Sequence, residues 1–276
     1  MKQKDLGVIK DFGKEWNYYT QADLSNDELQ KIFNNYFSIF PWELINNESV
    51  GFDMGSGSGR WAKFIAPKVK HLHCIEPSSS INISKQNLKE FKNCSFHNVK
   101  ITDVELKEKS MDFGYSLGVI HHISEFENAI KKCLFLLKPN APMLFYFYYA
   151  FDNKPIWYKA LWLITNPIRL MISRLPFIIK LFLTTIIANL IYYPLTRISK
   201  LLSFFNINTK NVPLSYYKDM SLYTMRTDAL DRFGTKLELR FNKKEIKNIL
   251  ELNGLKKIKF SNAAPFWCVV GQKEDS

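Results

Sequence analysis

The sequence predicts an α/β protein built on a mostly parallel sheet with helices on both faces. Between residues 48 and 150, apolar stretches of strand length alternate with amphipathic stretches of helix length. A glycine-rich turn, residues 55–59, directly follows the first of these strands. Strands that alternate with helices favour parallel pairing, because each helix returns the chain to the edge where the next strand begins. Ligands of such sheets bind at the carboxyl ends of the strands, where this turn is expected.

The first clear helix is predicted over residues 25–40. Ser25 and Glu28 form a capping box, in which each side chain satisfies a free backbone amide at the helix start. Apolar residues then repeat on one helical face, and Pro41 ends the helix.

Strands and helices then alternate to residue 150, and a helix and two strands close the chain. The predicted strands cover 49–54, 70–76, 111–118 and 143–150, and the helices between them begin near Arg60 and cover 79–91 and 124–137. The last helix, 242–254, has Asn242 as its cap and Gly254 just past its end. The closing strands are predicted at 255–260 and 266–271.

Composition points to a folded intracellular protein. The chain of 276 residues is 46% hydrophobic, which is enough for a large core. Its first residues are polar and mixed, so no secretory signal is expected. The four cysteines form no C-x-x-C pair, which favours a reducing cytoplasm and predicts neither a disulfide framework nor a metal site.

The net charge of +12 is concentrated in one segment. Nine Lys and Arg residues and no acidic residue lie between Asp152 and Asp219, so the remainder of the chain is nearly neutral. This pattern does not predict a basic surface over the whole fold, so no nucleic-acid partner is expected.

That basic segment, residues 153–220, is also strongly apolar. Its five prolines are predicted to divide it into short helices, the longest unbroken piece being 177–193, so a membrane-spanning helix is not expected. Its cations and flanking aromatic residues are typical of a membrane interface. Three interpretations stay open: a helical substrate cap, a homodimer surface and an anionic membrane-surface patch. We expect these helices over the carboxyl end of the sheet, with part of their apolar surface exposed.

The glycine turn restricts the choice of ligand. Gly55, Gly57 and Gly59 let the backbone pass close to a ligand, and the following helix should offer free amides to an anionic group. A dinucleotide fingerprint needs a glycine at the place of Arg60. Asp53, at the end of the strand, would suit a cationic ammonium instead.

In order and spacing, these motifs resemble those of class I S-adenosylmethionine-dependent methyltransferases. The stretch "VGFDMGSGSGR" resembles the first motif of this family, and Glu76 is similar to its acid that binds the ribose hydroxyls. "LKPNAPMLF" resembles the turn before the fifth strand of that family. "SLGVIHHI" resembles the end of strand four in the small-molecule branch, which includes quinone methylases and the type 11 and type 12 domains.

The resemblance implies a Rossmann-like sheet of seven strands, the last of them antiparallel. It implies an N-terminal helical lid at 1–47, a cofactor-binding domain at 48–152 and 221–276, and the helical insertion at 153–220. S-adenosylmethionine would be the cofactor and S-adenosylhomocysteine the product. The implied cofactor-binding residues are Asp53, Gly55, Ser56, Gly57, Gly59, Glu76, Asn98, Ser116, Leu117 and Trp16. For the adenine amino group, Asn98 and Asp103 are alternatives.

The implied reaction is methyl transfer to an oxygen or carbon nucleophile of a small molecule, with a lipid or lipid-linked sugar among the candidates. His121 and His122 follow strand four and are candidate general bases; alternatively, one packs on a helix and the other is a loop residue. Strand four lacks the [DN]-P-P-[YF] tetrad of adenine and glutamine methyltransferases, which disfavours a nucleic-acid base. The candidate substrate contacts, which a salt-bridged surface turn would equally explain, are Tyr149, Tyr216, Arg226, Asp228, Asp231 and Arg232.

Two other functions remain as alternatives. One is a nicotinamide-dependent oxidoreductase, and the other is a non-catalytic binding module at a membrane surface. The expected location is the cytoplasm, with a peripheral position on the inner face of the membrane.

Overall fold

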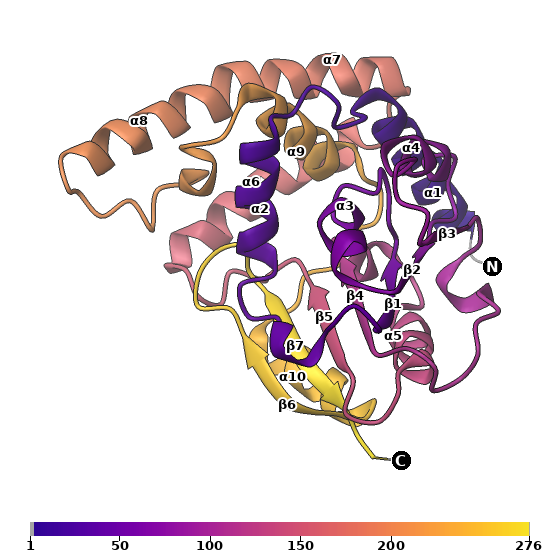
Figure 1. The fold of residues 1–276 in the computed structure, drawn as a ribbon. Helices are drawn as coiled ribbons and strands as arrows, with labels where there is room; N and C mark the ends of the chain where they lie inside the picture. Colours follow the sequence, from indigo (N-terminus) through magenta and orange to yellow (C-terminus); the bar gives the residue numbers. More distant parts are fainter. Residues whose placement is uncertain (1–2, 276) are drawn as a thin grey trace. The chain divides into compact units, whose positions relative to one another are not determined.

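The computed structural model describes residues 3–275, which form two compact units (Figure 1). The first unit comprises residues 3–22, 29–149 and 237–275, and the second comprises 23–28 and 150–236. The second unit extends beyond the expected insertion because helix α9 (Leu222–Gly234) packs against α6 (Ile156–Ile172) and α7 (Phe177–Ile187).

The first unit is built on a seven-stranded sheet in the order β3-β2-β1-β4-β5-β7-β6. Strands β1 to β5 run parallel, and β7 runs antiparallel to both β5 and β6. The strands are β1 (Val50–Met54), β2 (His71–Ile75), β3 (Cys94–His97), β4 (Phe113–Leu117), β5 (Pro142–Tyr146), β6 (Leu255–Phe260) and β7 (Cys268–Lys273). The predicted fold, including its antiparallel last strand, is confirmed.

Alternating side chains of the central strands pack on opposite faces of this sheet. Phe52 and Met54 join a core with the buried residues of α5 and α10. Tyr115 packs the other way, with its ring 5.3 Å from Phe37, next to α2. The helices of this unit are α1 (Gln3–Tyr18), α2 (Asn26–Tyr36, from residue 29 onward), α3 (Ala62–Ile65), α4 (Ile81–Asn87), α5 (Phe126–Leu136) and α10 (Lys243–Leu252).

Some helix ends follow the predicted signals, whereas α2 ends at Tyr36, before the predicted stop at Pro41, and α4 is shorter than the predicted 79–91. Asn242 caps α10 in a full capping box with Glu245, and Gly254 follows with a φ of +83°. The helix expected from Arg60 is only α3, because Pro67 follows it closely and disfavours helical backbone before itself. Residue patterns alone predicted the first helix at 25, and α1 was anticipated only as part of the helical lid that the resemblance implied at 1–47.

The second unit contains α6, α7, a π-helical turn (Ala188–Tyr192), α8 (Tyr193–Phe204) and α9. The prediction that prolines divide this segment into short helices holds at Pro176, which separates α6 from α7, and is wrong at Pro167 and Pro194. Pro167 lies inside α6, and residues Phe177–Phe204 form one helix through Pro194. The wider turn of the π-helix lies directly before Pro194 and relieves the clash of its ring with the preceding turn. By length and composition this helix could cross a membrane, and only 22% of its most apolar window is buried.

Glu28 takes a different partner from the one predicted. The Glu28 amide donates to Ser25 Oγ at 3.2 Å, as half of a capping box requires. The Glu28 carboxylate instead accepts hydrogen bonds from the Ser221 amide at 2.8 Å and from Thr224 Oγ1 at 2.6 Å. This carboxylate therefore reinforces the start of α9, which Ser221 caps.

Candidate active site

The turn after β1 needs its glycines. Gly55, Gly57 and Gly59 have φ values of +85°, +53° and +76°, a region that side chains with a Cβ rarely adopt. A Cβ at Gly55 would lie 2.4 Å from Val119 Cγ2, and a Cβ at Gly59 would lie 2.6 Å from Ser84 Oγ. The turn is therefore held close against β4 and α4, at the carboxyl edge of the parallel strands.

The backbone amides of this turn are already used within the protein. The Gly55 and Ser56 amides donate to Ile75 O at 2.8 and 3.0 Å, and the Gly59 amide donates to Ser56 O at 2.8 Å. These three positions of the turn therefore offer no free amide to an anion. A pyrophosphate would need such donors, so the local geometry disfavours a dinucleotide.

Glu76, just after β2, lies beside the turn. Its carboxylate accepts hydrogen bonds from the Gly57 amide at 3.1 Å and from the Ser78 amide at 2.9 Å, and the residue is 7% exposed. Asn98 Nδ2 donates to the carbonyls of Glu76 and Ser78 at 2.8 and 3.1 Å. Each carboxylate oxygen can accept a second hydrogen bond, so the fixed carboxylate can bind two neighbouring hydroxyls.

Asp53 is buried at the end of β1, with 1% of its surface exposed. Burial raises the pKa of its carboxyl to about 8, and the charge of Glu76 adds to the rise, while Tyr115 and Arg60 oppose it. Among residues 3–275, Asp53 Oδ2 has no hydrogen-bond partner. An ammonium group would satisfy this oxygen and favour the ionised carboxylate.

Two of the remaining predicted cofactor residues lie at the end of β4. Ser116 Oγ donates to Met54 O at 2.9 Å and so ties β4 to the end of β1. Leu117 is buried at the last position of β4. The carboxyl ends of β1, β2 and β4 therefore bring Asp53, Glu76 and Ser116 to one edge of the sheet.

Helix α1 lies over the glycine turn. A Cβ at Gly57 would lie 3.2 Å from Trp16 Nε1, and the Arg60 guanidinium lies over the Trp16 and Trp61 rings at 4.8 and 4.3 Å. Ser124 Oγ donates to Asp5 Oδ2 at 2.7 Å, which fixes α1 to the loop after β4. The four-residue spacing of Val8 and Phe12 was the signal that could have revealed this helix.

The two candidate bases differ in their surroundings. His121 is fully buried and its ring stacks on Tyr148 with centroids 3.9 Å apart. Burial lowers the pKa of His121 well below its usual range, and His122 and Arg240 add to this, so the ring is neutral at pH 7. His122 Nδ1 lies 2.6 Å from Leu237 O. Because a carbonyl oxygen only accepts, Nδ1 of His122 carries a proton.

The predicted substrate residues belong to different units. Tyr149 lies in the first unit, where its carbonyl accepts from Arg240 Nη1 at 3.1 Å. The other five lie in the second unit and contact their neighbours there. Arg226 Nη2 donates to Asn189 Oδ1 at 3.2 Å, and the negative charge of Asp228 contributes to the raised pKa of Tyr217, which burial dominates.

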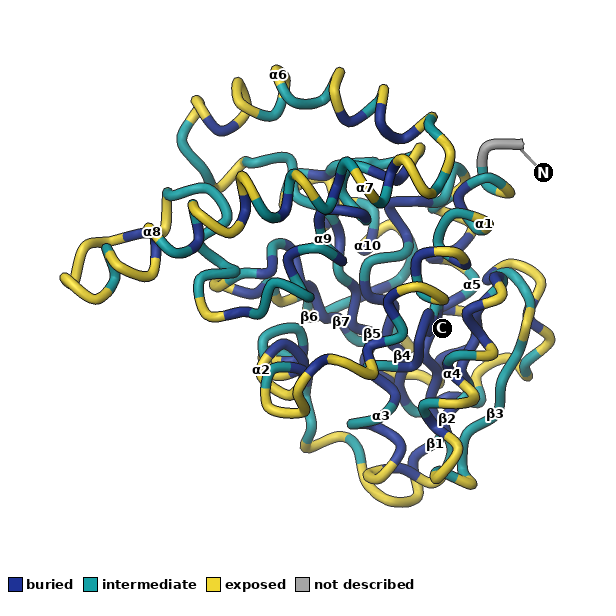
Figure 2. Tube along the Cα trace, turned by 90° about the horizontal axis from the view of Figure 1, so that it is seen from above, coloured by how far each residue is buried: buried dark blue, intermediate teal, exposed yellow. Residues whose placement is uncertain are grey.

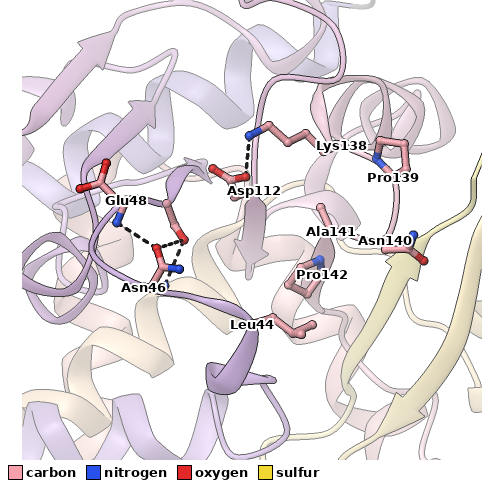
Figure 3. Close-up of a pocket in the computed structure, with 10 residues that line it drawn as sticks. Leu44, Asn46, Glu48, Asp112, Lys138, Pro139, Asn140, Ala141 and Pro142 are labelled. Atoms are coloured by element: carbon pink, nitrogen blue, oxygen red, sulfur yellow. Dashed lines mark hydrogen bonds and ion pairs between the residues drawn. The ribbon is translucent and has the colours of Figure 1, made fainter.

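A surface pocket of the first unit lies at the opposite edge of the sheet, near the amino-terminal ends of β1, β4 and β5 (Figure 3). Asp112 fills a structural role there, because it accepts from the Val50 amide at 2.8 Å and from Lys138 Nζ at 2.6 Å. Ligands of parallel sheets bind at the carboxyl edge, so this pocket is separate from the candidate site. Across residues 3–275, no group of three His, Cys, Asp or Glu side chains could hold a metal ion.

Comparison with known proteins identifies the domain. Residues 52–145 match the family model "Methyltransferase domain". No curated protein matches the sequence significantly.

Two solved structures share the fold at low sequence identity, and a third aligns over a shorter part of the chain. A possible histamine N-methyltransferase from Thermotoga maritima aligns over 96% of this chain and 98% of its own, with a TM-score of 0.55 and 13% identity. A possible exported protein from Bordetella parapertussis aligns over 89% and 68%, with a TM-score of 0.51 and 10% identity. A candidate sarcosine dimethylglycine methyltransferase from Galdieria sulphuraria aligns over only 42% of this chain and 46% of its own, with a TM-score of 0.40 and 18% identity.

Proposed function

Because the chain carries a class I S-adenosylmethionine-dependent methyltransferase domain, we propose that it transfers a methyl group to an oxygen or carbon atom of a small molecule. The observation that carries this proposal is the Glu76 carboxylate, which the Gly57 and Ser78 amides hold beside the glycine turn.

The residues at the carboxyl edge fit the cofactor. Glu76 would accept hydrogen bonds from both ribose hydroxyls, and Asp53 Oδ2 would accept from the ammonium of the methionine part. Trp16 would close over the turn, next to Arg60. The cofactor supplies an electrophilic methyl group on a sulfonium, so the protein mainly has to align the acceptor and exclude water.

Between the two histidines, His122 is the better general base for a hydroxyl acceptor. The Leu237 carbonyl fixes the proton on Nδ1, so the lone pair of the neutral ring lies on Nε2. The low pKa of His121 makes it a weak base, and its ring stacks on Tyr148. Its role in this proposal is to position Tyr148 and the loop after β4.

An apolar acceptor, such as a lipid or a lipid-linked sugar, is the substrate class that we propose. The second unit supports it, because it exposes many large apolar side chains on α6, α7 and α8. With this acceptor, the location that we propose is the cytoplasm, at the inner face of the membrane. The four free cysteines are consistent with that reducing location.

The test is methyl transfer from S-adenosylmethionine labelled in its methyl group. Lipid extracts and water-soluble phenols or sugars are offered separately, and we expect label in the lipid fraction. His122→Asn should lower kcat by roughly two to four orders of magnitude, whereas His71→Asn, on β2 and bonded to Ser95, is the matched control. Label only in water-soluble products would exclude the lipid class. Cofactor binding without any transfer would favour the binding-module alternative.

A further inference from the structure

The long helix of the second unit, Phe177–Phe204, has its polar residues on the buried side and its apolar residues on the exposed side. Its buried residues recur about every four positions and are mostly polar or small: Lys180, Thr184, Ala188, Tyr192, Thr196 and Ser199. Its exposed side carries Ile178, Phe182, Leu190, Ile198, Leu201 and Phe204. Phe182 is 64% exposed and Leu190 is 72% exposed. A helix on the surface of a soluble protein shows the opposite arrangement.

Several polar side chains of this buried stripe form hydrogen bonds within the unit. Lys180 Nζ donates to Gly234 O at 2.9 Å, at the carboxyl end of α9. Thr184 Oγ1 donates to Lys180 O at 2.8 Å. A four-residue spacing drifts by about 40° per step on an α-helix, and the wider π-helical turn corrects this drift midway. The polar side therefore faces α9 along α7 and the π-helical turn, and the short helix Ser215–Tyr217 along α8, while the apolar side stays exposed.

Helix α6 repeats this arrangement. Arg169 is buried and donates from Nε to Asn166 Oδ1 and from Nη1 to Thr235 O, both at 2.9 Å. Ile156, Ile164 and Met171 are exposed, Ile156 to 88%. Figure 2 shows exposed residues, in yellow, recurring along α6, α7 and α8. Two independent helices thus expose apolar side chains that a soluble monomer would bury.

The charged residues within the segment 153–218 have one sign, although Lys200 pairs with Asp219 just beyond it. Residues 153–218 contain no acidic residue, and Lys159, Arg174, Lys200 and Lys210 are exposed. We propose that α6 and the helix Phe177–Phe204 form a docking face for a bilayer with anionic lipid head groups. Apolar side chains would enter the acyl boundary while the cations contact the head groups. This inference deepens the membrane position in the proposed function by assigning it to particular helices, and vesicle binding tests it independently of methyl transfer.

In this proposal, both helices lie in the plane of the membrane, although Phe177–Phe204 is long enough to span it. Helix α9 packs along α7, and it carries Asp228, Asp231 and Arg232. A spanning α7–α8 would draw these charges into hydrocarbon, at a cost of a few kcal/mol for each charge. A symmetric dimer through the same face is also disfavoured, because it would oppose cations to cations without any carboxylate from this segment.

The experiment is flotation of the full chain with vesicles of phosphatidylcholine alone and of phosphatidylcholine mixed with phosphatidylglycerol. We expect binding to the mixed vesicles at low salt, weakened at high salt. The double variant Phe182→Gln with Leu190→Gln should lower the partition coefficient at least about tenfold, because two apolar side chains no longer enter the membrane. Both positions are exposed, so the fold should tolerate the change. Leu252→Gln is the matched control, since Leu252 is 87% exposed on α10 of the first unit.

Three outcomes would overturn the proposal. The first is no binding to mixed vesicles at low salt. The second is an equal loss of binding in Leu252→Gln and the double variant. The third is a dimer in solution that the double variant dissociates, without vesicle binding by the wild type, which would assign the face to a second copy. An alkaline carbonate wash tests the in-plane orientation: release from the membrane supports it, and retention would indicate a spanning helix instead.

Discussion

Helices α10 and α7 belong to different units, and both have one polar and one apolar side. The apolar side is buried in α10, whereas the polar side is buried in α7. In α10, Ile246 and Leu250 are buried and the charged residues Lys244, Glu245 and Lys247 are exposed. In α7, Lys180 and Thr184 are buried and Phe182 is exposed. Periodicity in a sequence therefore predicts that a helix is two-sided, but the partner of each side decides which side becomes the interior.

The buried ionisable side chains of the two units also differ in their surroundings. Asp53, in the first unit, has a pKa raised by burial, so its carboxyl is largely protonated near neutral pH. Lys180 and Arg169, in the second unit, bind the carbonyls of Gly234 and Thr235 at the end of α9. Cations at a helix carboxyl end interact favourably with its dipole and its free carbonyls.

The largest expected contrast concerns one phenylalanine in each unit. Phe145→Ala removes a fully buried ring from β5 and should lower the free energy of unfolding by about 3–5 kcal/mol. Phe182→Ala removes an exposed ring from α7 and should change it by less than about 0.5 kcal/mol. Urea unfolding followed by circular dichroism measures both. Similar losses for the two variants would show that the outer side of α7 is covered in solution.

The next contrast concerns a buried and an exposed lysine. Lys180→Met keeps the side-chain length but leaves Gly234 O without this donor, so we expect a loss of roughly 1–3 kcal/mol in unfolding free energy. Lys159→Met, at an exposed position of α6, is the matched control and should change little. The same unfolding assay applies. If Lys180→Met were more stable than the wild type, the polar stripe would not hold α7 on α9.

A third contrast, spread over several pH units and small per unit, is the pH dependence that Asp53 causes. The folded-state pKa of about 8 exceeds the unfolded value near 3.8, so the folded protein binds the extra proton between these limits. The free energy of unfolding should therefore fall as the pH rises through this window, by at most about 1.4 kcal/mol per pH unit. Asp53→Asn should show a flatter profile. An unchanged profile would mean that Asp53 is ionised in the folded protein.

Local signals in the sequence predicted most of the first unit. Apolar strands, glycines that need positive φ and caps such as Asn242 act within a few residues, and the structure follows them. Residue patterns did not reveal helix α1, because its residues are mostly polar and its apolar spacing is sparse. The partner of Glu28 could not be predicted, because Ser221 and Thr224 lie far along the chain.

The second unit was harder to predict for a physical reason. Pro194 ends helices in most contexts, but a π-helical turn before it lets the helix continue. The sequence did not reveal which side of α7 is buried, because Thr and Lys are usually exposed and Ile and Phe are usually buried. Only the carbonyls at the end of α9 explain why Lys180 lies inside.

Titration calorimetry with S-adenosylhomocysteine tests the central claim most directly, namely that the glycine turn and Glu76 hold this cofactor. We predict binding of S-adenosylmethionine and S-adenosylhomocysteine and none of nicotinamide dinucleotides. Glu76→Ala should weaken binding by roughly 1–3 kcal/mol, because a charged acceptor of ribose hydrogen bonds is lost. Glu48→Ala, at an exposed position beside Lys70, should leave the affinity unchanged. A preference for the dinucleotide, or an affinity that Glu76→Ala does not alter, would contradict the account.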